Sequence, residues 1–149
     1  MSVGPSPFLP NAELEAQDSR FLRLFSEALD RFSSGVLPVR SVRTIRLRTE
    51  HPRGFVGLTT YSAASPEGWQ RPPSVVNATQ TITFYTNMLY QLSDEAVQAV
   101  MVHELAHAWL NEHVSPEESK EREREADELA AKWGFTTELE ALDQEADSI

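Results

Sequence analysis

The sequence predicts an α+β fold in which a small, mainly antiparallel three-stranded sheet packs on an N-terminal helix and two later helices. Two observations predict it. Apolar residues recur at helical spacing near both ends of the chain, whereas three short runs in the middle have the composition of strands. The length of 149 residues favours a single domain, with residues 1–10 as a loose arm and residues 138–149 as an acidic tail.

The N-terminal helix is predicted over residues 11–32, where the apolar side chains repeat every three or four positions. Gly35 and Pro38 follow as stop signals. Three strands are then predicted, at residues 41–49, 54–61 and 79–86.

Charge is distributed unevenly along the chain, whose formal net charge is −10. Residues 76–149 hold four Lys or Arg against sixteen Asp or Glu, so this half would repel the phosphates of a nucleic acid. The first strand is rich in arginine and could be interpreted as a nucleic-acid-binding strand. We prefer an ordinary amphipathic strand, with Ile45 and Leu47 in the core and Arg46 and Arg48 in solvent.

The N-terminal residues MSVGPSPFLP contain neither the basic region nor the apolar stretch that is typical of a signal peptide. No apolar run approaches the ~18 residues that a membrane span requires. The chain has no cysteine, which excludes disulfides and thiolate chemistry. We therefore expect a soluble, cytoplasmic protein that contacts neither membrane nor nucleic acid.

Two helices are predicted in the acidic half of the chain. The first begins near Ser93, whose hydroxyl can cap it, and ends near His113; apolar residues lie almost all round it, so it should be buried. The second begins with Ser115 as N-cap and Pro116 in the first turn, and Gly134 ends it. The short turn between them predicts a helical hairpin.

The first of these helices contains the motif HExxH. Residues four apart lie on one face of a helix, so His103 and His107 can direct their rings at one ion. Glu104 lies about 100° round the helix, where it can reach a water without binding the ion itself. Burying such side chains unpaired would cost roughly 1–3 kcal/mol each, and a metal removes that cost. The motif therefore predicts a zinc site.

Two residues compete to be the third ligand of this site. His113 has the offset of the last histidine in HExxHxxGxxH, but Leu110 stands where the required sharp turn needs glycine. Glu123 needs no special turn, because in a helical hairpin it would lie as deep as His107, roughly 9–10 Å from the turn. We predict Glu123 as the ligand, and interpret His113 as a helix-end residue that is favourable against the helix dipole.

Other glutamates flank Glu123 in the run KEREREADE. Glu123 shares its face with Ala126 and Ala130, whose small side chains would let two helices approach closely. Asp127 follows one turn later and can accept a hydrogen bond from a ligand histidine, which would orient its ring. Glu125 has leucine at the corresponding position, and we predict that it lies in solvent.

HExxH followed by ExxxD on a second helix resembles the gluzincin metallopeptidases, most closely the HtpX-like branch and its small soluble members, the minigluzincins. The resemblance is carried by TITFYTNMLYQLSDEAVQAVMVHELAH and EREADELAAKWG. It implies a zincin-like fold and zinc-dependent hydrolysis of peptide bonds. The implied zinc ligands are His103, His107 and Glu123, with Glu104 as general base on zinc-bound water and Asp127 as hydrogen-bond partner of a ligand.

The resemblance also implies that the strand at residues 81–86 borders the cleft and binds a peptide or protein substrate by strand addition. Four residues are candidates to polarise the scissile carbonyl: Tyr61, Tyr85, Tyr90 and His51. Two other functions remain open, a zinc-binding regulatory or partner-recognition module without general proteolytic activity, and a helical interaction domain without metal. The acidic tail is expected to fray in solvent, or alternatively to reach the metal and inhibit the site.

Overall fold

The structure is a computed structural model that describes residues 4–5, 13–14, 18–32, 39, 42–49, 57–63, 78–114 and 119–146. Several predicted features lie outside the described residues: Gly35, Pro38, His51, Ser115 and Pro116.

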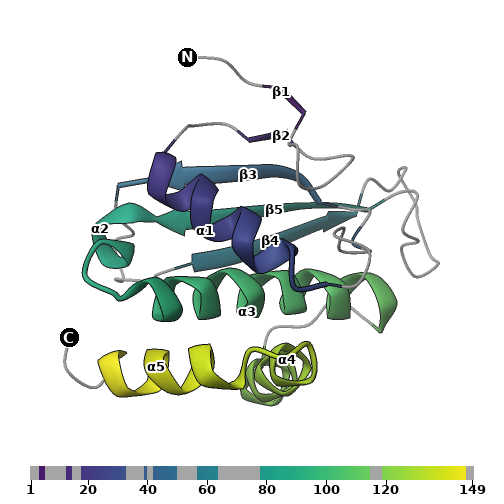
Figure 1. The fold of residues 1–149 in the computed structure, drawn as a ribbon. Coiled ribbons are helices and arrows are strands. Elements are labelled where there is room, and N and C mark those ends of the chain that lie inside the picture. The colour runs from purple at the N-terminus through teal and green to yellow at the C-terminus, as the bar shows by residue number, and fades with distance from the viewer. Residues whose placement is uncertain are drawn as a thin grey trace.

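The strands that the structure describes form one five-stranded sheet, which is one layer of the molecule (Figure 1). Its strands are β1 (Gly4–Pro5), β2 (Glu13–Leu14), β3 (Val42–Arg48), β4 (Gly57–Ala63) and β5 (Ala78–Tyr85). They lie in the order β1-β2-β3-β5-β4. The predicted mixture of helix and sheet is confirmed, but the mainly antiparallel sheet is wrong. The pairs β2–β3 and β3–β5 are parallel, because β5 inserts between the two strands that precede it in the chain.

The central position of β5 also overturns the expectation of strand addition along residues 81–86. β5 pairs with β3 on one side and with β4 on the other, so the backbone groups of the strand are already engaged. Among the strands that the structure describes, β4 lies at the edge of the sheet next to β5.

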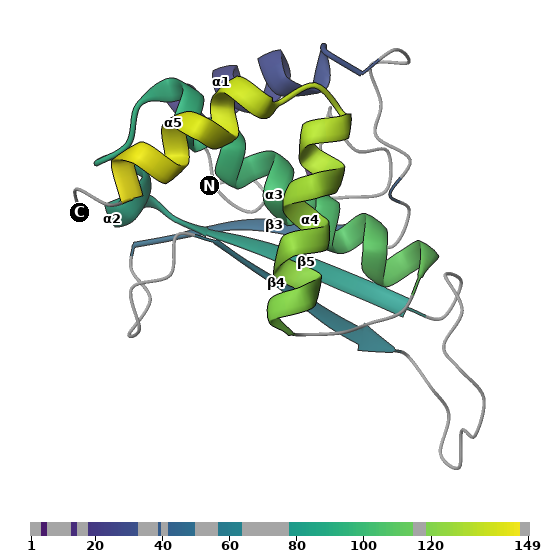
Figure 2. The ribbon, with the colours of Figure 1, turned by 90° about the horizontal axis from the view of Figure 1, so that it is seen from below.

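The helices form two further layers on one face of the sheet (Figures 1 and 2). They are α1 (Ser19–Leu29), α2 (Thr86–Leu89), α3 (Asp94–His113), α4 (Lys120–Lys132) and α5 (Thr136–Ala146). α3 packs on β4 and β5 with α1 beside it, and α4 and α5 cover the opposite side of α3. α3 is thus enclosed between the sheet and the outer helices. Within the described residues, no helix is long and apolar enough to cross a membrane.

The N-terminal segment differs from its prediction in where the helix begins and in the expected loose arm. α1 begins at Ser19, because the side chain of Asp18 caps it by accepting a hydrogen bond from the backbone N–H of Phe21 at 2.9 Å. The residues expected in its first turn include Glu13–Leu14, which form β2. Gly4–Pro5, expected in a loose arm, form β1 and pair with β2.

The side-chain pattern of the first long strand is confirmed. Ile45 is fully buried and Leu47 packs against the same core, whereas Arg46 and Arg48 are exposed. The core beneath the sheet joins this strand to Phe21 of α1 and Phe84 of β5, whose ring centroids lie 5.1 Å apart.

The predicted limits of α3 are confirmed, and those of α4 are confirmed at one end. Ser93 caps α3 by accepting from the N–H of Ala96 at 3.2 Å, and the helix ends at His113. α4 is capped by Ser119 and not by Ser115, so it begins later than predicted. Gly134 ends it with a φ of +101°, a conformation that glycine adopts without strain.

The acidic C-terminal residues were expected to fray in solvent, which is wrong for those that the structure describes, because they form α5. Leu139 and Leu142 are partly buried and pack against the buried cores, so one apolar side of the helix contacts the core despite its acidic composition. Glu145 binds the N-terminus of α3, accepting from the backbone N–H of Ser93 at 2.7 Å and from its hydroxyl. α5 therefore neither frays nor reaches the HExxH histidines through Glu145.

Candidate metal centre

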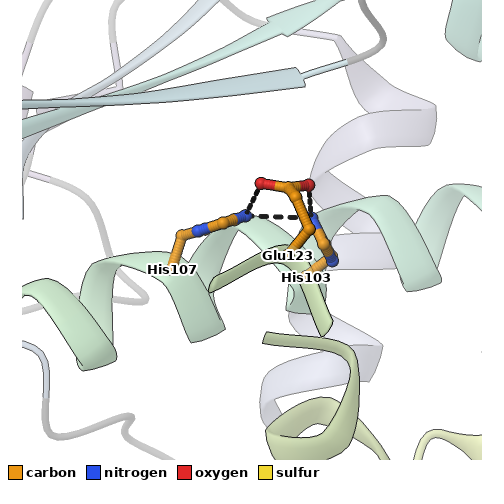
Figure 3. A group of neighbouring side chains, drawn as sticks. All are labelled: His103, His107 and Glu123. Atoms are coloured by element: carbon orange, nitrogen blue, oxygen red, sulfur yellow. Dashed lines mark hydrogen bonds and ion pairs between the residues drawn. The ribbon is translucent and has the colours of Figure 1, made fainter. Parts of the chain in front are cut away.

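Three side chains of α3 and α4 converge on one point (Figure 3). His103 and His107 lie one turn apart on α3, and Glu123 extends toward them from α4. One potential ligand atom from each residue lies within 4.8 Å of the others, so the group could hold a metal ion. The three residues predicted as ligands are therefore brought together.

The helices that carry these residues do not form the predicted hairpin. Figure 1 views α4 almost along its axis while α3 lies across the view, so the two helices cross steeply. Ala106 of α3 and Ala126 of α4 are fully buried in one cluster at this crossing. Their small side chains let the backbones approach closely, which carries Glu123 onto the exposed side of the histidine pair. The ligand was predicted correctly from a packing geometry that was wrong.

The distances within the group are somewhat shorter than those between the ligand atoms of a tetrahedral ion. The Nε2 atoms of His103 and His107 are 3.1 Å apart, and the carboxylate of Glu123 lies 3.1 Å from the first and 2.7 Å from the second. A tetrahedral zinc ion with bonds of about 2.0–2.1 Å holds its ligand atoms about 3.4 Å apart. Both Nε2 atoms face the same carboxylate, and small outward movements would admit the ion between them.

Asp127 orients the first histidine. Its carboxylate lies 2.8 Å from Nδ1 of His103, so the ring donates from Nδ1 and can present the Nε2 lone pair to an ion. The predicted partnership between Asp127 and a ligand histidine is present in the structure. Because Asp127 lies one turn after Glu123 on α4, the same helix supplies a ligand and the group that orients another ligand.

The pKa values of the two histidines are shifted in opposite directions. Burial lowers the pKa of His103, but its hydrogen bonds to Asp127 and Glu123 and the nearby Glu104 charge outweigh burial and raise that pKa to about 10. Burial together with the His103 charge lowers the pKa of His107. The hydrogen bond from His103 lowers the pKa of Glu123, which keeps its carboxylate ionised. Without a metal, His103 therefore carries the proton of the pair at neutral pH.

Glu104 lies beside the group but is directed to the sheet. Its side chain is buried, and the Thr59 hydroxyl of β4 donates to its Oε1 at 2.6 Å. Burial is the main reason that the pKa of Glu104 is raised, which makes its carboxylate a stronger base. The sequence alone did not identify Thr59 as part of the site. Which residue of α3 Thr59 contacts depends on how β4 pairs with β5 and packs on the helix.

His113 takes no part in the group. Its ring stacks on Trp109 with centroids 4.3 Å apart, and its Nδ1 lies 3.1 Å from the backbone carbonyl of Trp109. The interpretation as a helix-end residue is therefore confirmed. Glu125 is not one of the grouped residues. It was predicted to lie in solvent, but it is half-buried and pairs with the buried Arg122 at 3.0 Å.

Four residues were candidates to polarise the scissile carbonyl. Among the described residues, no contact links any of these candidates to the histidine pair. The hydroxyl of Tyr90 donates to Asp18 at 2.8 Å, next to the start of α1. Tyr85 is buried in β5. The side chain of Tyr61 and all of His51 lie outside the described residues.

A buried pair of amides ties the C-terminal half of α3 to the sheet. Gln80 of β5 donates to the carbonyl of Ala108 at 2.9 Å, and the Nδ2 of Asn111 donates to Gln80 at 2.9 Å. Both side chains are buried. Gln80 is in phase with the buried residues Ile82 and Phe84, and this alternation was the signal that could have placed it in the core.

Comparisons of the chain with protein-family models, curated proteins and solved structures find no match. What the site can do follows from its own atoms: two imidazole nitrogens and a carboxylate that could hold a metal ion, a carboxylate that orients one ligand, and a separate buried carboxylate held by a hydroxyl.

Proposed function

We propose that this chain is a zinc-dependent metallopeptidase of the gluzincin type, with a zincin-like fold. The observation that carries the proposal is the convergence of His103, His107 and Glu123 on one point. Glu104 is close enough for its charge to act on His103. Two imidazoles and one carboxylate form a donor set of catalytic zinc sites, which keep a fourth position for water or substrate. Structural zinc sites use four protein ligands instead, so a group to which the described part of the chain contributes three ligands favours catalysis.

Zinc bound to this group would act as a Lewis acid that lowers the pKa of a water and polarises a carbonyl oxygen. The chain itself contributes the order around it. Asp127 holds the His103 ring so that Nε2 faces the group, and the crossing of the helices holds Glu123 between both rings. The ligands are thus positioned by two helices of the scaffold, which is more precise than placement on loops.

Glu104 is the proposed general base and acid. Its burial raises its pKa and so favours its taking a proton from the attacking water. After the carbonyl is attacked, the protonated carboxyl can deliver that proton to the leaving amine. Glu104 is not one of the three grouped residues, so in this proposal its carboxylate transfers protons and does not bind the ion.

The proposed substrate is an extended peptide that adds to the edge of β4. This replaces the expected binding along residues 81–86, where the backbone is already paired on both sides. Thr59 of β4 contacts Glu104, so a peptide along that strand would pass close to the proposed base. Main-chain hydrogen bonds to an edge strand hold a peptide extended with little dependence on its sequence.

Zinc content and peptide hydrolysis test the proposal together. Metal analysis of protein purified without added zinc should give about one zinc per chain for the wild type and Glu104→Gln, and none for His103→Ala. Hydrolysis of casein or a peptide library should be lost in both variants. Glu128→Gln is the matched control, since Glu128 pairs with Arg124 on the exposed side of α4 and should retain both properties.

Each alternative has a distinct outcome in this experiment. Stoichiometric zinc without turnover of any peptide would favour a regulatory or partner-recognition module. Absence of zinc would favour a helical interaction domain, and hydrolysis that survives in Glu104→Gln would refute the mechanism. The expected cytoplasmic location stays a prediction, which cell fractionation would test.

A further inference from the structure

The hydroxyl of Thr59 has two acceptors within reach, both on Glu104. It lies 2.6 Å from the carboxylate Oε1 and 3.2 Å from the backbone carbonyl of the same residue. A hydroxyl has a single hydrogen, and 2.6 Å is the length of a charge-assisted O–H···O⁻ bond. Thr59 therefore donates to the carboxylate, and its side chain joins the edge strand of the sheet to the motif helix.

The backbone that carries Thr59 is held by the interior of the sheet. Thr59 lies directly opposite Ile82 of β5, which is fully buried. Residues that lie opposite each other in an antiparallel pair project to the same face, so Thr59 projects toward α3 as Ile82 does. The hydroxyl is consequently fixed relative to α3, because the core packing of Ile82 fixes the strand.

Glu104 needs such a partner. Its side chain has three rotatable bonds, and in the interior a carboxylate without a donor is unfavourable. Among the described residues, Thr59 is the one whose side chain donates to this carboxylate. This bond engages Oε1, and no described residue donates to Oε2, so we assign Oε2 to the water.

We propose that Thr59 is a positioning residue, which holds Oε1 of Glu104 so that Oε2 faces the attacking water. The role rests on the proposed function, because Glu104 is the general base of that reaction. β4 would then align two components at once, the main chain of the peptide along its edge and the base through Thr59.

Removing and restoring the hydroxyl tests the role. Thr59→Val keeps the shape of the side chain without the donor, and Thr59→Ser keeps the donor. Thr59→Val should lower kcat by about 10–100-fold, part of the effect of a general base, with KM and zinc content unchanged. Thr59→Ser should restore kcat to near the wild-type value, and the acidic limb of the pH profile of kcat should shift in Thr59→Val alone.

Thr83→Val is the matched control. Thr83 lies on β5 between Ile82 and Phe84 and so projects to the opposite face of the sheet from these buried residues. This variant should leave kcat, KM and the pH profile unchanged. Thermal unfolding of all three variants shows whether a loss of activity arises from misfolding, and Thr59→Ser decides the role if Thr59→Val is unstable.

A second readout needs no activity. In the metal-free protein, the ¹³C carboxyl signal of Glu104 reports the hydrogen bond, and it should move in Thr59→Val and return in Thr59→Ser. If the wild type hydrolyses no peptide, the proposed function fails while this signal still decides whether Thr59 holds Glu104. A wild-type kcat in Thr59→Val, absence of rescue by Thr59→Ser, or an unchanged carboxyl signal would each overturn the inference.

Discussion

Zinc binding should depend steeply on pH, because the ion must displace a proton from His103. In the metal-free protein burial lowers the pKa of His103, but hydrogen bonds to Asp127 and Glu123 raise it to about 10. A metal ligand has to be unprotonated, so protons compete with zinc at every pH below this pKa. The competition weakens as the pH rises, and apparent affinity should therefore increase with pH.

The size of the effect follows from the pKa. With a pKa of about 10, His103 is almost fully protonated between pH 7 and pH 9. Each pH unit in that interval should strengthen zinc binding about tenfold, so the whole interval is worth about 2.7 kcal/mol. The pKa of His107 is lowered, so this second ligand is already neutral and adds no competition. Displacement of the His103 proton should contribute about one proton to those released with each ion bound.

Chelator competition at pH 7, 8 and 9 measures the affinity, and titration calorimetry in buffers of different ionisation enthalpy counts the protons. Glu104→Gln is the control for the other buried acid in the site, and its proton count should stay near that of the wild type. An affinity that is constant over this interval, or binding without proton release, would refute the reasoning.

Three further results are expected. Asp127→Asn should weaken zinc binding about 10–100-fold at pH 9 and reduce the proton release, because His103 loses the carboxylate that orients and charges it. Competition titration measures the affinity, and calorimetry counts the protons. Ala126→Leu should destabilise the protein by about 1–3 kcal/mol in urea unfolding, because Ala126 is fully buried where α3 and α4 cross, whereas the exposed Glu128→Leu should not. Glu145→Gln should lower the free energy of unfolding at neutral pH, because the hydrogen bonds from Ser93 lower the pKa of Glu145 in the folded protein. In urea unfolding, the difference from wild type should shrink as the pH falls below 4.5, the ordinary pKa of the group. A difference that grows in acid would contradict this.

The predictions that succeeded depend on local spacing. His103 and His107 share a face because they are four residues apart in a helix, whatever surrounds it. Ser93 caps α3 and Gly134 ends α4 through contacts with residues only a few positions away. The choice of Glu123 over Glu125 depended on the alanines and Asp127 of the same helix face, which is also a local property.

The predictions that failed depend on residues far apart in the chain. β5 was expected at an edge, but alternation of side chains does not specify which strands pair, and β5 lies between β3 and β4. The residues of α5 were interpreted as a tail because they are acidic, whereas the spacing of Leu139 and Leu142 allows one apolar side to pack on the cores. Neither the position of β5 in the sheet nor the packing of α5 could be predicted without knowing the surfaces against which they pack.

The sequence by itself determined which groups are available for the chemistry: two histidines on one helix face, a glutamate beside them, and a glutamate and an aspartate one turn apart on the next helix. Only the tertiary structure decided how they meet. The steep crossing over Ala106 and Ala126 brings Glu123 to both rings, and the pairing of Thr59 with Ile82 places a hydroxyl on Glu104. Helix periodicity is a property of neighbours in the chain, whereas helix crossing and strand order depend on close packing between distant segments.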